Sequence, residues 1–436
     1  MENMTVSEIA ARAKAAALKL ARLSTDIKNR ALEKMAESLE GLSGPILEAN
    51  RKDLEAAKRE SIPGPLIARL SLNEEKIRGM ARGILSVAKL PDPVGREKHT
   101  VELDKDLVLH QVTCPIGVIG AIFESRPDAI PQIASLCFKS GNAVILKGGK
   151  EAQNTNKVLV SLLVSAMGQV PGVPLAGIQM IETRSEVSEM LKEDRFINLI
   201  VPRGSNAFVK YIQENTKIPV LGHSEGICHC YVDDGADMAK AIRILLDAKL
   251  QYPAACNAME TLLLDEKIAG KILPDLVRKF REEGVELVGC NKICQLAPEI
   301  ARAGENEWDE EYNDLKLSMK VVQGVKEAID FINTHGSGHT DSIITEDEDK
   351  ARMFLNEVDS ASVMWNASTR FADGFRYGLG AEIGISTNKT HARGPVGLEG
   401  LVIYKYQLIG DGQTVEDYTG ENAREFTHKP LSPIQG

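Results

Sequence analysis

Four short apolar segments between residues 117 and 201 decide the fold: GVIGAIF (Gly117–Phe123), NAVIL (Asn142–Leu146), GIQMI (Gly177–Ile181) and FINLIV (Phe196–Val201). Each has the length of a buried strand, and helical patterns lie between them at residues 130–140, 155–167 and 184–193. Alternating strands and helices predict a doubly wound parallel sheet, in which ligands bind at the carboxyl ends of the strands. We therefore expect an α/β fold.

The chain before this core is predicted to be helical from Thr5 to about residue 89. Two residue pairs have the spacing of capping boxes, in which each side chain satisfies an orphan amide of the first turn: Thr5 with Glu8, and Ser71 with Glu74. The N-terminus lacks the pattern of a signal peptide, and no segment approaches the ~18 apolar residues of a membrane helix. We expect a cytoplasmic protein with no membrane partner.

A hairpin and a second α/β series flank the core. Alternating apolar and polar residues at His99–Leu103 and Leu107–Thr113 predict two strands around a turn at residues 104–106. From about residue 226 further strands are predicted, among them Cys228–Val232 and Thr261–Leu264. Leu401–Tyr406 is predicted to be another strand, and the tail behind it is polar and rich in Gly and Pro.

The composition is ordinary for a globular protein, with 43% hydrophobic and 26% charged residues among 436. The chain carries 52 Lys and Arg against 62 Asp and Glu, a formal charge of −10. Nucleic-acid binding relies on the neutralisation of phosphates, so this acidic balance argues against a nucleic-acid partner. The seven scattered cysteines indicate reduced thiols and leave open whether one of them is reactive.

Two glycine-containing turns follow predicted strands. Residues 147–150 (KGGK) carry two lysines beside two glycines, but the motif fits no phosphate-loop pattern, so a solvated turn is the better interpretation of these residues alone. Residues 203–205 (RGS) lie between a predicted strand and a predicted helix. Two interpretations of these residues are equally well supported: a pocket for a diphosphate, and a plain turn in which Ser205 is the helix N-cap.

Cysteine and histidine residues offer two further sites. Cys256 lies in YPAACN among small neighbours that leave a thiol accessible, yet spacing alone favours a buried cysteine that acts as a small hydrophobe. Histidine and cysteine are the usual zinc ligands, and four of them lie close together in the sequence: His223, Cys228, His229 and Cys230. Their spacing, however, fits no usual zinc motif. On a strand His229 would face away from both of its cysteine neighbours, so we expect no metal.

Longer strings extend these motifs: IFESRPD (Ile122–Asp128), LKGGKEA (Leu146–Ala152), PRGS (Pro202–Ser205), GHSEGICH (Gly222–His229), YPAACNA (Tyr252–Ala258), WNASTRFADG (Trp365–Gly374), GLGAEIGIST (Gly378–Thr387) and HARGPVGLEGL (His391–Leu401). They closely resemble the γ-glutamyl phosphate reductase family of the aldehyde dehydrogenase superfamily, roughly from Thr5 to Tyr406. The resemblance implies an aldehyde dehydrogenase-like fold in three parts: a dinucleotide-binding domain (1–95, 115–224 and 386–397), a catalytic domain (225–385), and a β-hairpin arm for homo-oligomers with the tail (96–114 and 398–436).

The reaction that the resemblance implies is the reduction of γ-glutamyl phosphate by NADPH to glutamate-5-semialdehyde and phosphate, the second step of proline biosynthesis. Cys256 corresponds to the nucleophile that forms a thioacyl intermediate, and Ser125, the Cys256 amide or Asn257 would hold the oxyanion. The general-base glutamate of oxidising relatives is His223 here, which fits reduction better than oxidation. The alternatives are an aldehyde-oxidising dehydrogenase and a non-catalytic metal-binding module.

The resemblance also implies residues for the cofactor. Lys147 corresponds to the lysine that holds the adenosine ribose, Gly204 and Ser205 to the turn near the diphosphate, and Glu310 to the acid at the nicotinamide ribose. Lys150 replaces a glutamate that bonds the ribose hydroxyls in many relatives that use NAD. A cation there can pair with a 2′-phosphate, so we expect NADP(H).

For the substrate, Arg126 is a candidate for the phosphate or the α-carboxylate. Four residues are candidates for the amino-acid end, with exposed structural roles equally consistent: Asn366, Ser368, Thr369 and Arg370. The number of subunits stays open, as does the docking of a separate glutamate 5-kinase that would pass on the acyl phosphate.

Overall fold

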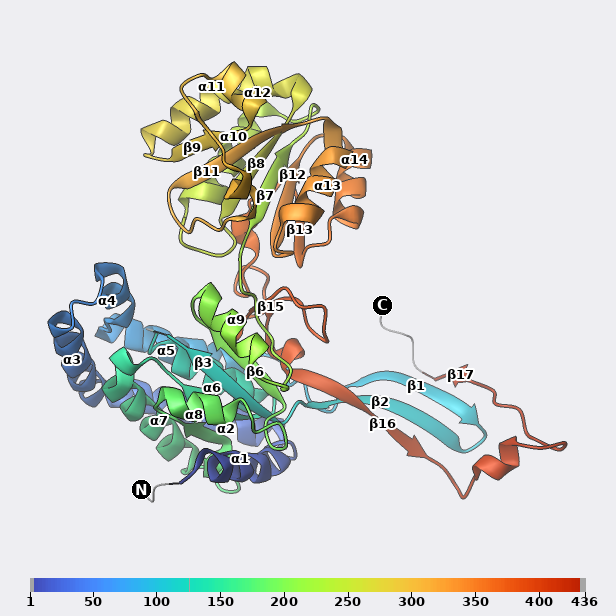
Figure 1. Cartoon of the computed structure of the whole chain (residues 1–436). Helices are drawn as coiled ribbons and strands as arrows, with labels where there is room; N and C mark the ends of the chain where they lie inside the picture. Colours follow the sequence, from blue (N-terminus) through green and yellow to red (C-terminus); the bar gives the residue numbers. More distant parts are fainter. Residues whose placement is uncertain (1–3, 125, 432–436) are drawn as a thin grey trace.

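The computed structural model describes residues 4–124 and 126–431, which form two α/β bodies and a projecting β-sheet arm (Figure 1). Ser125 lies outside the described residues. The N-terminal helices cover the first body: α1 (Val6–Leu20), α2 (Thr25–Gly41), α3 (Ser43–Arg59), α4 (Gly64–Leu70) and α5 (Glu74–Lys89).

One of the two predicted capping boxes is confirmed. At α1 the Thr5 side chain accepts from the Glu8 amide, and the Glu8 carboxylate accepts from the Thr5 amide. The box expected at Ser71 is wrong, because α5 begins two residues later than that box requires and Asn73 caps it, accepting from the Lys76 amide at 2.8 Å.

The first body contains the predicted parallel sheet, with the strand order β5-β4-β3-β6. Its strands are β3 (Val118–Phe123), β4 (Ala143–Lys147), β5 (Ile178–Met180) and β6 (Leu199–Arg203), and its helices are α6 (Ala129–Lys139), α7 (Gln153–Met167), α8 (Arg184–Met190) and α9 (Asn206–Glu214). From β3 the chain adds strands on one side and then crosses to the other side with β6. The carboxyl ends of β3 and β6 therefore form a topological switch point, where open α/β sheets bind ligands.

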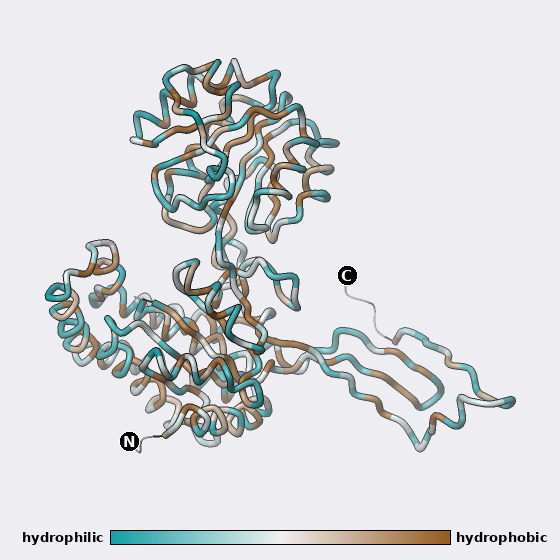
Figure 2. The backbone as a smooth tube through the Cα atoms, in the orientation of Figure 1, coloured by the Kyte–Doolittle hydropathy of each residue, from teal (hydrophilic) through white to brown (hydrophobic). Residues whose placement is uncertain are grey.

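The second body is built on a seven-stranded parallel sheet in the order β10-β9-β11-β8-β7-β12-β13. Its strands are β7 (Cys228–Val232), β8 (Met259–Asp265), β9 (Glu286–Gly289), β10 (Ala301–Arg302), β11 (Lys316–Val322), β12 (Thr340–Ile344) and β13 (Ser362–Trp365). Its helices are α10 (Met238–Leu250), α11 (Glu266–Glu282), α12 (Asn291–Leu296), α13 (Gly324–His335) and α14 (Glu348–Glu357). The brown strands in Figure 2 mark its apolar core, with more hydrophilic segments outside.

The arm is a four-stranded antiparallel sheet in the order β16-β2-β1-β17. It consists of β1 (Glu97–Asp104), β2 (Leu107–Pro115), β16 (Val402–Ile409) and β17 (Lys429–Pro430). The predicted hairpin and the predicted last strand are confirmed, and Asp106 takes the positive φ of 57° that the tight turn needs. The tail was predicted only as polar, yet it returns to pair with β1.

A short hairpin, β14 (Gly384–Ser386) with β15 (Gly394–Val396), joins the three parts. Ile383 and Val396 of this hairpin pack into the core of the first body. The predicted domain boundaries stay a prediction. Within the described part of the chain, no helix combines the length and the apolar character needed to cross a membrane.

Candidate active site

Cys256 lies in the loop between α10 and β8, at the amino edge of the seven-stranded sheet. The residue is half-buried, and its backbone is held from behind. A Cβ on Gly226 would lie 2.1 Å from the Cys256 carbonyl oxygen, so only glycine fits there. The Cys228 thiol donates to the same oxygen at 3.3 Å. These contacts fix the loop, and the Cys256 side chain remains partly accessible.

Two imidazoles surround this thiol. One ring nitrogen each of His223 and His339 lies within 4.8 Å of the Cys256 Sγ and of the other ring nitrogen. The two rings meet edge to face, with their centroids 4.8 Å apart. His223 Nδ1 donates to the Ile385 carbonyl at 2.8 Å, which leaves its Nε2 as an acceptor in the neutral ring. The structure thus brings His223, which stands at the position of the glutamate base of oxidising relatives, close to the thiol.

Arg203 reaches toward Cys256 from the carboxyl end of β6. Burial lowers its pKa most, and the charge of Arg126 acts in the same direction. Glu382, Asp128 and the Cys256 thiolate favour its charged form. Arg203 of the first body thus lies within the electrostatic reach of both Arg126 and the Cys256 of the second body.

Arg370 of the second body also lies within the electrostatic reach of Cys256, from the short helix η4 (Thr369–Phe371). It is buried, its Nε donates to Gln251 at 2.9 Å, and its guanidinium lies 6.0 Å from the centroid of the Tyr252 ring. Burial lowers its pKa, whereas a charge on Cys256 raises it. The predicted substrate residue Arg370 is thus an electrostatic neighbour of the thiol.

The other predicted substrate residues differ in position. Arg126 is exposed ahead of α6. Asn366 turns the chain after β13 with a φ of 53° and accepts from the Thr345 amide, at the carboxyl edge of the sheet, so the structure does not bring it to Cys256. Ser368 caps η4, where its Oγ accepts from the amide of the second residue beyond it. Thr369 is fully buried, and its Oγ1 has no hydrogen-bond partner among the described residues.

Of the predicted oxyanion donors, Asn257 is buried beside the nucleophile. Its side-chain Nδ2 donates to the Ala372 carbonyl at 2.8 Å, which ties the cysteine loop to the end of η4. One of the two Nδ2 N–H groups is thus used, and the roles predicted for Ser125 and Asn257 stay predictions.

The switch point of the first sheet contains the predicted turn at Gly204 and Ser205. Ser205 is the N-cap residue of α9, and its amide donates to a Glu124 carboxylate oxygen at 3.3 Å. The end of this helix thus receives an anion in the structure, as a site for a diphosphate should. The Glu124 carboxylate also lies 2.9 Å from where a Cβ of Gly204 would be, so a side chain would fill this space.

Lys147 and Lys150 lie beside the same edge. Lys147 is the last residue of β4, next to β3, and burial lowers its pKa. Lys150 is exposed at the start of η1 (Lys150–Ala152). A Cβ on Gly148 would lie 2.1 Å from Asn156 Nδ2, and Asn156 Oδ1 is buried without a partner among the described residues. Glycine backbone, an orphaned acceptor and two cations at one edge fit a dinucleotide.

Glu310, predicted at the nicotinamide ribose, is exposed at the end of η3 (Glu305–Asp309). Its neighbour Glu311 accepts from Asn206 Nδ2 at 2.8 Å and so links the second body to the first turn of α9. Glu311 is therefore the acid that lies at the helix expected to hold the diphosphate. The role predicted for Glu310 at the nicotinamide ribose stays a prediction.

The four residues considered for zinc do not assemble into one site. His223 lies near Cys256 and His339, whereas His229 is buried against Asp341, whose carboxylate accepts from its Nδ1 at 2.8 Å. Burial raises the pKa of the thiols of Cys137, Cys228 and Cys230, which keeps them protonated.

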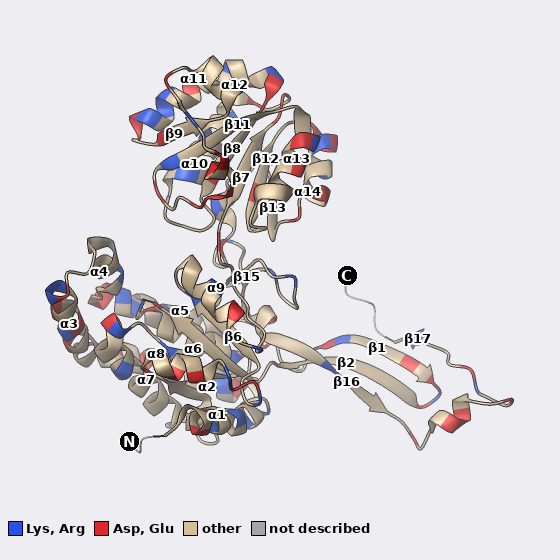
Figure 3. Ribbon diagram, viewed as in Figure 1, with Lys and Arg blue, Asp and Glu red and all other residues tan. Residues whose placement is uncertain are grey.

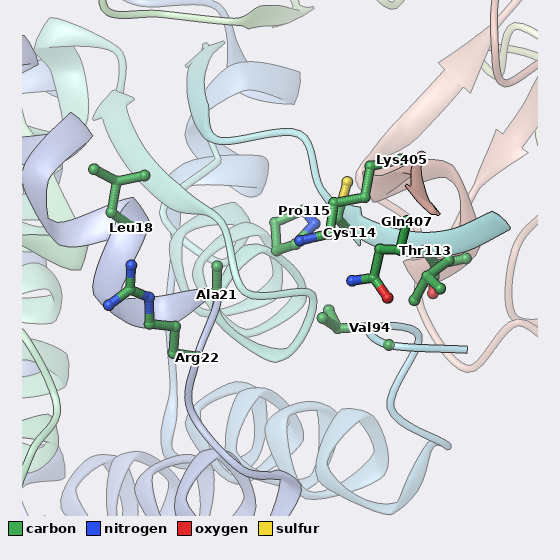
Figure 4. A pocket seen from close by; sticks show the side chains of 11 residues that line it. Leu18, Ala21, Arg22, Val94, Thr113, Cys114, Pro115, Lys405 and Gln407 are labelled. Carbon is green, nitrogen blue, oxygen red and sulfur yellow. The ribbon is translucent and has the colours of Figure 1, made fainter. Parts of the chain in front are cut away.

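A separate cavity of about 350 Å³ lies at the root of the arm. Figure 4 shows it between Arg22 at the end of α1 and Lys405 on β16, with Cys114 of β2 in its wall. The predicted catalytic and cofactor residues are absent from its described lining, so this cavity is not the candidate active site.

Four ionisable residues near the site were not predicted: Arg203, Glu311, His339 and Glu382. Burial raises the pKa of the Glu382 carboxyl, which accepts from the Gly374 amide at 2.8 Å. His339 precedes β12 and so lies at the same sheet edge as Cys256. A single histidine or arginine in the sequence does not by itself indicate a functional site. Of these four residues, Arg203 alone could be placed near a site, because it follows a predicted strand at the carboxyl edge of the first sheet.

The comparisons with known proteins agree with this geometry. The profile of the aldehyde dehydrogenase family matches residues 1–310. A γ-glutamyl phosphate reductase of Acetivibrio thermocellus is 53% identical over 98% of this chain and 99% of its own length. One from Methanococcoides burtonii is 55% identical over 96% and 95%. The crystal structure of γ-glutamyl phosphate reductase from Thermotoga maritima is similar with a TM-score of 0.92 and 40% identity, covering 94% of this chain and 100% of that one.

Proposed function

The chain belongs to the aldehyde dehydrogenase family and, within it, to the γ-glutamyl phosphate reductases, and from this premise we propose that it reduces γ-glutamyl phosphate with NADPH through a thioester on Cys256. This reaction is a step of proline biosynthesis that yields glutamate-5-semialdehyde and phosphate. The observation that carries the proposal is the position of Cys256, half-buried between two imidazoles and within the field of Arg203 and Arg370.

The acylation step begins with the thiol proton. A ring nitrogen of His223 or His339 takes it, and the thiolate attacks the γ-acyl carbon. As the C–S bond forms, the bond between the acyl carbon and the phosphate oxygen breaks, and phosphate leaves with that electron pair. Arg203 and Arg126 stabilise the departing anion, and Arg370 holds the α-carboxylate from the other side.

The second half of the reaction resolves the thioester. NADPH, when bound, supplies the hydride that brings the acyl group to the aldehyde level. Lys147, Ser205 and Glu311 would hold the cofactor at the carboxyl edge of the first sheet, facing the cysteine loop. The tetrahedral adduct on Cys256 then collapses as the C–S bond breaks and the aldehyde leaves. The imidazole returns its proton to the sulfur.

The experiment that tests the proposal is the reverse assay, phosphate-dependent reduction of NADP by glutamate-5-semialdehyde. Cys256→Ser should lower kcat by at least about 10³-fold, because the hydroxyl is a far weaker nucleophile than the thiolate. Cys290→Ser is the matched control, a half-buried free cysteine at the start of α12, and should retain activity. Near-normal turnover of the Cys256 variant would contradict the covalent mechanism.

The cofactor of this family is a nicotinamide dinucleotide, and the finer preference for NADP(H) rests on Lys150. Lys150 is exposed and directly follows the glycine pair at residues 148 and 149, so its ammonium can pair with a 2′-phosphate. Lys150→Glu should therefore raise the KM for NADPH about tenfold or more and improve the use of NADH. An unchanged ratio of the two kcat/KM values would exclude Lys150 as the discriminating residue.

The arm supports a proposal of homo-oligomers. Its outer strand β16 exposes several large apolar side chains: Ile403, Tyr404, Tyr406, Leu408 and Ile409. In Figure 3 the strands β2 and β16 are mostly tan, so few charges oppose contact with a second copy. A monomer in light scattering would contradict this proposal. Docking of glutamate 5-kinase and a cytoplasmic location stay predictions of the sequence.

A further inference from the structure

We propose that His223, Cys256 and His339 together form a binding site for a thiophilic divalent cation, best matched by zinc, and that the bound ion blocks the nucleophile. Only the consequence for catalysis rests on the proposed function, because a sulfur that ligates a metal cannot attack an acyl phosphate. The three candidate ligand atoms lie within 4.8 Å of one another.

The first support is an orphaned nitrogen. His339 is fully buried ahead of β12, and its Nε2 has no hydrogen-bond partner among the described residues. Its other nitrogen, Nδ1, lies 2.8 Å from the Thr340 hydroxyl and 3.8 Å from the Cys228 sulfur. A buried polar atom without a partner costs free energy, so a ligand that uses its lone pair stabilises the folded chain.

The second support is the orientation of His223. Its Nδ1 donates to the Ile385 carbonyl at 2.8 Å, which fixes the ring and makes Nε2 the free acceptor. Imidazoles that ligate metals commonly donate their other N–H to a carbonyl in this way, because the hydrogen bond sets both the tautomer and the direction of the lone pair. The ring of His223 is thus oriented as a ligand before any ion arrives.

The donor set selects the ion. One thiolate and two imidazoles suit zinc and related transition metals, whereas calcium and magnesium prefer oxygen ligands. Tetrahedral zinc, with bonds of about 2.0–2.3 Å, places its ligand atoms about 3.3–3.6 Å apart. The half-buried Cys256 and His223 would therefore close by about 1 Å on the fixed His339. Three protein ligands leave the fourth position for water.

The surrounding positive charges weaken metal binding at this site and so make it reversible. Arg203 and Arg370 lie within the field of the Cys256 thiolate and repel a divalent cation, so the site should bind more weakly than a structural zinc site. Binding converts the Cys256 thiol to a thiolate and releases its proton to solvent, with no change of oxidation state. Zinc and the acyl phosphate then compete for the same sulfur.

The test uses the reduced full-length chain and cobalt(II), a spectroscopic substitute for zinc. We expect stoichiometric binding with a thiolate-to-cobalt charge-transfer band that Cys256→Ser abolishes. His339→Asn should weaken cobalt and zinc binding by at least about tenfold. The matched control is His110→Asn, a half-buried histidine that pairs with Glu97 on the arm, and it should bind as the unmodified chain does. A charge-transfer band that persists in Cys256→Ser would overturn the proposal.

A second measurement needs no variant. Zinc should slow the alkylation of Cys256 by iodoacetamide, read by mass spectrometry, and a chelator should restore it; equal labelling with and without zinc would overturn the proposal. The outcomes also separate the two proposals. A chain that shows the cobalt band but has no reductase activity retains the metal site and loses the proposed function. An active reductase without band or protection retains the function and loses the metal site.

Discussion

The two edges of the seven-stranded sheet differ in whether their buried polar groups have hydrogen-bond partners. At the carboxyl edge the Tyr231 hydroxyl donates to Asp233 and Asp265, each at 3.1 Å. Asp233 also accepts from the Thr345 hydroxyl at 2.8 Å and from the Lys350 ammonium at 2.9 Å. Within the described residues, the buried polar atoms of this cluster all have partners.

The amino edge, where Cys256 lies, contains buried polar atoms that lack partners among the described residues: Asn257 Oδ1, His339 Nε2 and Thr369 Oγ1. Each such atom costs about 1–3 kcal/mol of stability, so their concentration around one thiol calls for a ligand that completes them. The network at the carboxyl edge therefore stabilises the body, whereas the amino edge keeps the unpaired groups that the proposed chemistry needs. Under that proposal, ligands bind at the carboxyl ends of the first sheet and at the amino ends of the second.

The largest expected change in stability comes from removing the Asp233 carboxylate at the carboxyl edge. Asp233→Ala removes an acceptor from four donor groups. The Gly235 amide and the Thr345 hydroxyl lose the acceptor they have in Asp233, whereas Tyr231 and Lys350 keep a second carboxylate in Asp265 and Asp234. We expect a loss of about 4 kcal/mol in the free energy of unfolding, measured by urea denaturation, with kcat/KM unchanged at low temperature. Asp233→Asn should lose less in the same direction. A fall in kcat/KM with full stability would show that this edge takes part in catalysis.

The second prediction concerns the buried pair Lys249–Glu260, which brackets the Cys256 loop. The two side chains are fully buried and 2.6 Å apart, and burial raises the pKa of Glu260 to about 7. Between its unfolded pKa of about 4.5 and about 7, the folded chain binds more protons than the unfolded chain, so stability falls as the pH rises through this range.

The expected size of this fall is about 3 kcal/mol between about pH 4.5 and pH 7. Glu260→Gln cannot ionise and should flatten that part of the profile, measured by urea unfolding at a series of pH values. Glu305→Gln, an exposed glutamate in the same body, is the control and should retain the slope. A slope that persists in Glu260→Gln would assign it to other groups.

The smallest effects come from two matched threonines, one at each edge. Thr369→Val removes a buried hydroxyl that has no partner among the described residues, so we expect a gain of about 1 kcal/mol in stability and a lower kcat/KM. Thr345→Val removes a hydroxyl that donates to Asp233 and accepts from the Asp347 amide, so we expect a loss of about 1–2 kcal/mol and unchanged kinetics. Equal stability changes in the two variants would remove the contrast between the edges.

Much of the fold could be predicted because its signals are local. Apolar runs marked the first parallel sheet, β7 and the hairpin, and Thr5 with Glu8 marked the first helix start. The Ser71 capping box failed because Asn73, two residues later, offers the better cap, a competition that spacing cannot rank. The pairing of the tail with β1 depends on contacts more than 300 residues apart, such as Thr427 with Glu102.

The candidate site could be predicted only in part. Cys256 was assigned from the resemblance, because its spacing alone favoured an inert thiol. His339 and Arg203 reach it from other strands, and only the sheet order brings them together. Asn366 and Arg370 are four residues apart in sequence, yet the positive φ of Asn366 turns the chain so that one lies at each edge.

The tail strand β17 also limits where a second copy could pair with the arm in the proposed homo-oligomer. It is two residues long, and its Lys429 and Pro430 pair with β1 through Glu102 and Val101. Proline has no N–H to extend a ladder, and lysine at an edge resists stacking, so this side of the sheet is closed to further strands. Among the strands at residues 4–124 and 126–431, β16 is the edge of this sheet that remains open. A sheet that can grow in one direction favours self-complementary, two-fold pairing over open filaments.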